Sequence, residues 1–237
     1  MAKREEMKKK TVVVHSGGMD SSICLALAIE QYGAGNVLAI SFTYGQRHQV
    51  EMDYAQKICK DWNVERKVID INCLGEITSN SLTNHDLEMT HKESEAPNTL
   101  VVGRNGLMAR IAGIHANHLG AKSIFMGVIE VEEANSGYRD CSRKYMDIIQ
   151  AALRMDFDQA NFEIKTPLVF LTKKQTMDLA YQMGQLQYLL ENTLSCYRGE
   201  SGFGCEECPA CHLRNNGIQE FLDTNEDFEF SYKDKFN

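Results

Sequence analysis

The chain has 237 residues, of which 43% are hydrophobic and 24% charged, and its formal net charge is −8. This composition is typical of a globular protein with about one α/β domain, and no apolar run approaches the length of a membrane-spanning helix. The negative charge disfavours a protein that binds nucleic-acid backbones, because these need a basic surface. The charged residues 1–10 lack an apolar signal core, so we expect a solvated tail, a cytoplasmic location and reduced cysteines.

The first predicted elements enclose a glycine-rich loop. Three β-branched residues, Val12–Val14, predict a strand, and the apolar pattern of Ile23–Ile29 predicts a helix. Between them lies Ser16-Gly17-Gly18-Met19-Asp20-Ser21. Glycines let backbone N–H groups approach an anion, and the helix N-terminus adds the positive end of its dipole. We therefore predict a phosphate site in which Ser16 and Ser21 donate hydrogen bonds and Asp20 caps the helix or binds Mg²⁺.

Further along, strands and helices are predicted to alternate. The predicted strands cover residues 36–42, 66–71 and 123–126, and the predicted helices cover 49–62, 104–119, 144–155 and 172–183. This order indicates an α/β fold, a parallel sheet with helices on both faces, whose ligands lie at the carboxyl ends of the strands. The polar stretch 72–98 is too long for an ordinary connection and predicts a functional lid.

Four cysteines near the C-terminus have the spacing of a metal site. Cys196, Cys205, Cys208 and Cys211 follow the pattern C-x8-C-x2-C-x2-C, with glycines between them. Such spacing predicts a closed, structural site of four thiolates. Zinc suits this set of ligands, and an iron–sulfur cluster is the alternative that the spacing leaves open. Cys24, Cys59, Cys73 and Cys141 are scattered and are predicted to be core or surface residues.

The glycine-rich loop resembles the PP-loop of ATP pyrophosphatases, Ser-Gly-Gly-x-Asp-Ser. Over residues 11–222 the chain also resembles the 7-cyano-7-deazaguanine synthases. The landmarks are Tyr44-Gly45-Gln46-Arg47-His48, Pro97-Asn98-Thr99, Gly103-Arg104-Asn105, Ser136-Gly137-Tyr138, Asp140-Cys141, Thr166-Pro167-Leu168, Lys173 and the four cysteines. Because these motifs span nearly the whole chain, the resemblance is more specific than any one of them.

The resemblance implies an ATP-dependent ligase of queuosine biosynthesis. In this family 7-carboxy-7-deazaguanine and ammonia give the nitrile through an acyl adenylate and an amide, with release of AMP and pyrophosphate. The resemblance implies the cofactors Mg²⁺ and structural Zn²⁺, ATP as a substrate and a homodimer, with neither nucleic acid nor membrane as a direct partner. Lys173 and Arg104 are candidate counter-charges for the phosphates.

The resemblance also assigns roles to individual residues. The ATP-binding residues would be Ser16, Gly17, Gly18, Met19, Asp20 and Ser21, and the catalytic residues Asp20, Ser16, Lys173 and Arg104. The substrate-binding residues would be Gln46, Arg47, Asn105, Glu133, Tyr138 and Asp140. The metal ligands would be Cys196, Cys205, Cys208 and Cys211.

The chain departs from the family pattern mainly in the loop 130–142, where the base is expected to bind. Glu132-Glu133-Ala134-Asn135 stands where the family has an aspartate and an aromatic residue before Ser136, Arg139 replaces a proline, and Ser142 replaces an arginine. This favours a second hypothesis, a divergent relative that forms an amide or joins a deazaguanine acid to another amine. A tRNA-thiolating enzyme is disfavoured by the net charge, and a binding module would leave most of the chain without a role.

We expect four regions: a charged tail at 1–10, the PP-loop domain at 11–190, a zinc segment with a closing helix at 191–223, and a tail at 224–237 that is disordered or docked. Three histidines have two interpretations each. His15 either approaches a phosphate or packs at the strand end, whereas His115 and His118 either bind a metal or form a polar helix face.

Overall fold

The computed structural model describes residues 8–45, 50–74, 100–130 and 138–236. Within these residues one sheet contains β1 (Thr11–Val14), β2 (Val37–Thr43), β3 (Glu65–Asp70), β4 (Ser123–Phe125) and β5 (Glu163–Lys165). All neighbouring pairs are parallel, in the order β3-β2-β1-β4-β5. The chain proceeds outward from β1 to β3 and then returns to the other side of β1. The strand order therefore switches between β1 and β4, the place where such sheets bind ligands.

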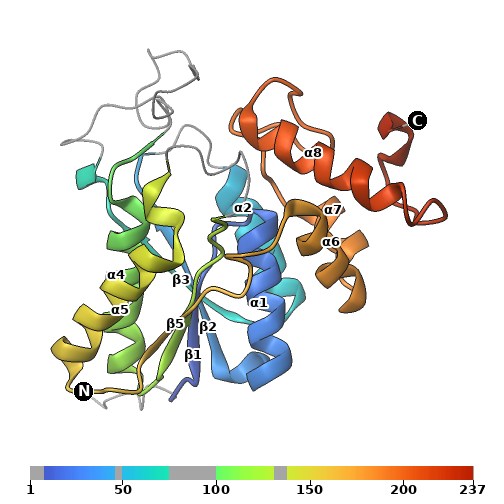
Figure 1. Ribbon diagram of the computed structural model, residues 1–237. Helices are drawn as coiled ribbons and strands as arrows, with labels where there is room; N and C mark the ends of the chain where they lie inside the picture. Colours follow the sequence, from blue (N-terminus) through green and yellow to red (C-terminus); the bar gives the residue numbers. More distant parts are fainter. Residues whose placement is uncertain (1–7, 46–49, 75–99, 131–137, 237) are drawn as a thin grey trace.

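Helices cover both faces of this sheet, which confirms the predicted fold class (Figure 1). They are α1 (Met19–Tyr32), α2 (Val50–Asp61), α4 (Arg104–His118), α5 (Arg143–Phe157), α6 (Lys173–Gln182), α7 (Leu186–Asn192) and α8 (Pro209–Leu222). Short 3-10 turns are η1 (Ala34–Asn36), η3 (Arg139–Cys141) and η4 (Lys233–Phe236). No helix in the described ranges is long and apolar enough to cross a membrane.

Alternating side chains of the central strands build two cores. Val13 on β1 belongs to the cluster formed with α1, α2 and α6–α8, whereas Val12 belongs to the cluster formed with α4 and α5. Both valines are fully buried. A strand that is buried on both faces has apolar residues at consecutive positions, and this explains the three consecutive valines, Val12–Val14. Each large apolar side chain that is buried stabilises the fold by about 1.5–3 kcal/mol.

The predicted strands and helices beyond α1 lie within two residues of the observed ones at each end. The sequence predicts neither β5 nor α7, which are short elements of 3 and 7 residues. The predicted lid falls almost wholly on residues 75–99, outside the described ranges. For the C-terminal tail, the docked alternative is the one observed: Phe228, Phe230 and Tyr232 pack against the core of α1 and α6–α8.

The start of the chain differs from the expected solvated tail at Lys9. Its side chain is only 4% exposed, forms an ion pair of 2.9 Å with Glu65 and donates to the Gly35 carbonyl at 3.0 Å. A buried ammonium needs such partners. Lys9 therefore belongs to the folded domain, beside the first residues of β3.

Candidate active site and cysteine cluster

The loop between β1 and α1 is held by its own side chains. Ser21 Oγ lies 3.1 Å from Ser16 Oγ and accepts the Ser16 N–H at 3.2 Å, while Ser16 Oγ accepts the Gly18 N–H at 3.3 Å. The Gly18 carbonyl accepts hydrogen bonds from the hydroxyls of Ser21 and Ser22 at 3.0 and 2.8 Å. These bonds hold the carbonyl against the first turn of α1. The positive end of the helix therefore faces the loop, as a phosphate site requires.

Two glycines allow this loop to pack closely. Gly17 has φ +87°, and a Cβ there would collide with the Glu51 carbonyl oxygen and the backbone of Ala55. Gly127, just after β4, would place a Cβ only 2.8 Å from the Ser21 nitrogen. Only glycine fits at both positions, because its neighbours are backbone atoms that cannot move aside.

A cavity of about 370 Å³ opens at the carboxyl ends of β1, β2 and β4. The predicted site residues that line it are Ser16, Gly18, Met19, Asp20, Ser21, Arg104, Asn105, Tyr138 and Lys173. Gly17 and Asp140 are not among the lining residues, and Gln46, Arg47 and Glu133 lie outside the described ranges. A larger, shallower and mainly apolar hollow of about 670 Å³ lies beside α1 and β5, away from these groups.

An ion pair stands beside the phosphate loop. Lys173 Nζ, at the start of α6, lies 2.5 Å from Asp20 Oδ1 in the first turn of α1. The lysine side chain is 8% exposed and the aspartate 29%. This pair brings together two predicted catalytic residues separated by 153 positions.

Arg104, at the start of α4, forms a second charged group in the cavity. Its guanidinium donates to the Tyr44 hydroxyl at 3.2 Å and lies 5.3 Å from the centre of that ring. Burial alone would lower the pKa of Arg104, but Tyr44, Tyr197 and Asp140 outweigh it and raise that pKa. Arg104 is therefore a permanent cation. The sequence analysis did not single out Glu51, which also lines the cavity.

Behind Arg104, two neighbouring residues join α4 to η3. Asn105 donates its backbone N–H to Asp140 Oδ2 at 3.1 Å and its amide to Cys141 Sγ at 3.3 Å. Asp140 is 6% exposed, and its Oδ1 is buried without a hydrogen-bond partner. A buried carboxylate oxygen without a partner is unusual in a folded protein and calls for an explanation, such as a catalytic role or contact with a bound molecule. Tyr138 lines the cavity and hydrogen-bonds to Tyr197.

The histidines take up structural positions. His15 is fully buried, with Nε2 3.0 Å from Ser22 Oγ and Nδ1 3.6 Å from Cys59 Sγ. Burial, helped by the charge of Arg66, lowers the pKa of His15 to about 3, so the ring is neutral. The packing interpretation of His15 is therefore the better one. His115 and His118 stack at 6.3 Å and belong to no metal-binding group in the described ranges.

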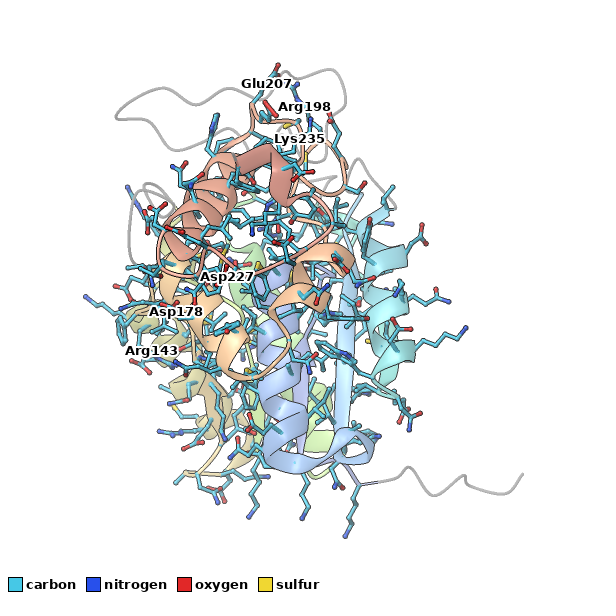
Figure 2. The ribbon with its side chains drawn as sticks, turned by 90° about the vertical axis from the view of Figure 1, so that its right-hand side faces the viewer. Arg143, Asp178, Arg198, Glu207, Asp227 and Lys235 are labelled. Atoms are coloured by element: carbon cyan, nitrogen blue, oxygen red, sulfur yellow. The ribbon has the colours of Figure 1, made fainter. Side chains whose placement is uncertain are left out.

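The four C-terminal cysteines converge as predicted. The sulfur atoms of Cys196, Cys205, Cys208 and Cys211 all lie within 4.8 Å of one another. Backbone N–H groups of Arg198 and Cys208 point at two of them, at 3.3 and 3.4 Å. Such N–H···S bonds stabilise thiolates that bind a metal. The donor set thus fits a tetrahedral ion, and Arg198 and Glu207 pair at its outer edge (Figure 2).

The cysteine segment, residues 191–223, also forms one wall of the cavity. Leu194 donates its N–H to the Gly17 carbonyl at 3.1 Å, and Tyr197, three residues later, lines the cavity. On α8, Gly217 packs against the side chain of Lys173. Sequence analysis predicted the metal site but missed this contact with the phosphate loop, because neither Leu194 nor Tyr197 lies in a motif that indicates it.

The family comparison agrees with this geometry. A model of the family described as "Queuosine biosynthesis protein QueC" matches residues 10–222.

Several solved structures are similar at low sequence identity. An NMN synthetase from Francisella tularensis is 18% identical with a TM-score of 0.46, covering 95% of this chain and 80% of its own. An NH3-dependent NAD synthetase from Campylobacter jejuni subsp. jejuni is 14% identical with a TM-score of 0.45, covering 94% and 77%. The U34-tRNA thiolase NcsA from Methanococcus maripaludis is 17% identical with a TM-score of 0.46, covering 94% and 69%. On the family match, this chain belongs to the QueC family of queuosine biosynthesis, whose members use ATP.

Proposed function

We propose that this protein is an ATP-dependent carbon–nitrogen ligase that converts 7-carboxy-7-deazaguanine and ammonia to 7-cyano-7-deazaguanine. The supporting observation is that a single cavity joins the phosphate loop to the group formed by Arg104, Asn105 and Tyr138. The loop suits the phosphates of ATP, and the second group offers a cation, an amide and an aromatic ring to a polar, planar base. Both substrates would therefore meet at the switch point of the sheet.

The first step of the proposed reaction is adenylation. A carboxylate oxygen attacks the α phosphorus of ATP, and the bond to the β phosphate breaks with its electron pair leaving on pyrophosphate. Ser16 and Ser21 would donate to phosphate oxygens and Lys173 would neutralise the leaving pyrophosphate. Asp20 would hold Mg²⁺, which supplies further positive charge when bound. Arg104 would orient the attacking carboxylate.

Amination and nitrile formation follow. Ammonia bonds to the acyl carbon and displaces AMP, which gives the amide and releases one proton. The amide oxygen then attacks the α phosphorus of a second ATP, pyrophosphate leaves with the electron pair of the broken bond, and the amide nitrogen loses one proton. Loss of the second N–H proton with departure of AMP gives the nitrile. The chain needs no nucleophilic side chain for these steps, only donors and charges placed around the reacting atoms.

The base would bind at the far side of the cavity from the phosphates. Asn105, Tyr138 and Asp140 are proposed to contact it, together with Gln46, Arg47 and Glu133. Asp140 does not itself line the cavity, but it lies directly behind Asn105, and its unpartnered Oδ1 is an acceptor that the N–H groups of a guanine-type ring could use.

The metal is proposed to be zinc in a structural role. Four thiolates leave no open position for a substrate, and zinc prefers this ligand set. An iron–sulfur cluster is the alternative that metal analysis would reveal. We further propose the regions 1–10, 11–190, 191–223 and 224–237 as functional divisions, a homodimer, and a cytoplasmic enzyme that acts on small molecules.

A second candidate function rests on the altered loop 130–142. A divergent relative would keep adenylation but stop at an amide, or would join the acid to another amine. The replacements at Arg139 and Ser142 favour it, because they fall where the base is expected to bind.

The test is to incubate the protein with ATP, Mg²⁺, ammonium and 7-carboxy-7-deazaguanine and to determine the mass of the base product by mass spectrometry. The nitrile, formed together with AMP and pyrophosphate, is the expected result. An amide as the end product, or turnover only with a different amine, would favour the second candidate. Absence of AMP formation under all these conditions would refute both.

A further inference from the structure

Glu51 is a carboxylate in the cavity to which the proposed function assigns no role. It is the second residue of α2, and its backbone carbonyl faces Gly17 at the phosphate loop. Its side chain is partly buried and lines the same cavity as Ser16 and Arg104. The Glu51 side chain therefore shares one cavity with the phosphate loop and with Arg104, the residue proposed to orient the attacking acid.

The charges around Glu51 come from the neighbouring elements. Arg104 of α4 and Tyr44, which follows β2, both interact with it electrostatically. On β3, Arg66 instead donates to Ser41 Oγ at 2.9 Å and lies 3.7 Å from the sulfur of Met52. Burial raises the pKa of Glu51 to about 7, and Arg104 opposes this only in part.

The other candidate bases that line the cavity are poorly suited to accept a proton, because each is paired, weakly basic or already protonated. Asp20 pairs with Lys173. His15 has both ring nitrogens in contact with neighbours, and its low pKa makes it a poor proton acceptor. Burial and the charge of Asp140 raise the pKa of the Cys141 thiol to about 12, so it stays protonated. Among the described carboxylates of the cavity lining, Glu51 is the one that has no ion-pair partner within 4.0 Å.

Amination requires a base at this place. When the lone pair of ammonia forms the C–N bond, the carbon–oxygen bond to AMP breaks and its electron pair leaves with AMP. The nitrogen then carries one proton too many, and this proton must pass to an acceptor. A base whose pKa lies near the working pH is best suited to the transfer.

We propose that Glu51 is the general base of the amination step and accepts the proton that the attacking ammonia loses. This inference rests on the proposed function, because it assumes an acyl adenylate in the cavity. The two steps can be tested separately. Adenylation needs no base at Glu51, so pyrophosphate exchange should be insensitive to this residue, whereas product formation should depend on it.

The experiment compares wild type with Glu51→Gln, Glu51→Asp and the exposed control Glu220→Gln. Exchange of labelled pyrophosphate into ATP, with the acid present and ammonia absent, measures adenylation. Formation of amide and nitrile, with free ammonia held constant across pH, measures amination. For Glu51→Gln we expect exchange within about threefold of wild type and product formation reduced about 10²–10⁴-fold. Glu51→Asp should recover part of this loss, and Glu220→Gln should behave as wild type.

The pH profile separates catalysis from a structural effect. Wild-type amination at constant free ammonia should rise through about pH 7, as Glu51 ionises, and this rise should be absent in Glu51→Gln. Equal losses of exchange and product in Glu51→Gln, or a retained pH rise, would overturn the inference while leaving the proposed function intact. Absence of exchange and product in wild type would instead refute the proposed function, and this inference with it.

Discussion

The phosphate loop and the cysteine segment build the same cavity in opposite ways. The loop is a local structure: Ser16, Gly18 and Ser21 bond to one another within six positions of the chain. The cysteine segment has its own sulfur cluster, yet it reaches the site through distant contacts, from Leu194 to Gly17 and from Gly217 to Lys173. The cysteine segment therefore forms a wall of the cavity from distant contacts, whereas the loop is the part proposed to bind and activate the phosphates.

The largest effect is expected when the phosphate loop loses its carboxylate, because this change should stop the reaction without affecting the cysteine segment. Asp20→Ala removes the carboxylate that pairs with Lys173 and is proposed to hold Mg²⁺. We expect AMP formation to fall at least about 10³-fold, because phosphoryl-transfer catalysis is almost entirely electrostatic positioning. Metal content, measured by elemental analysis, should equal that of wild type. A variant that still released AMP at the wild-type rate would disprove the assignment of the phosphate site.

Loss of the metal tests whether the wall supports the loop. Cys208→Ser, or chelation of wild type, should unfold the segment around the four sulfurs, because a structural metal contributes directly to folding. We expect the free energy of unfolding to fall by about 2–3 kcal/mol and the melting temperature to fall by about 5–10 °C. Nucleotide affinity, measured by titration calorimetry, should weaken at temperatures where the sheet is still folded. Unchanged affinity in the metal-free protein would mean that the two regions are independent.

A smaller effect is expected from the docked tail, which packs on helices α6–α8, and α8 belongs to the cysteine segment. Phe230 is 7% exposed and lies 4.8 Å from the Tyr232 ring, edge to face. Phe230→Ala should cost about 3 kcal/mol of unfolding free energy, as for other truncations of buried phenylalanine. Urea denaturation measures this change, and Phe170→Ala is the matched control because Phe170 is 63% exposed. Equal stability of the two variants would show that the tail does not pack as described.

The smallest effect is expected on the pH dependence of stability and comes from His15, the buried residue that precedes the phosphate loop. His15 has a folded pKa of about 3, below its ordinary value of 6.5, because it is buried. The unfolded chain therefore binds a proton that the folded chain does not, and stability falls as the pH drops from about 6.5 towards 3. We expect His15→Gln to reduce this slope by up to about 1.4 kcal/mol per pH unit, measured by denaturation between pH 4 and 7. An unaltered slope would contradict a neutral, buried His15.

Local patterns made most of the fold predictable from the sequence. Three consecutive valines and two adjacent glycines specify strand, loop and helix start within a few residues. The cysteine spacing likewise brings its sulfurs together, because the short C-x2-C intervals restrict the chain. Helix α7 escaped prediction since its three buried residues, Leu186, Leu189 and Leu190, span little more than one turn.

Contacts between distant residues could not be predicted in this way. The proximity of Lys173 to Asp20 depends on how α6 packs against α1. The position of Tyr197 depends on the path from α7 to the cysteines, and the role of Glu51 depends on burial, which no motif indicates. Each of these is a property of tertiary packing rather than of sequence spacing.

The most direct test of the account follows the oxygen atoms of the acid. The substrate is prepared with ¹⁸O in both carboxyl oxygens, and the AMP and pyrophosphate from complete turnover are weighed by mass spectrometry. Adenylation first of the acid and then of the amide predicts two AMP per nitrile, each carrying one ¹⁸O, and unlabelled pyrophosphate. Label in pyrophosphate, or AMP without label, would contradict adenylation of the acid in this cavity.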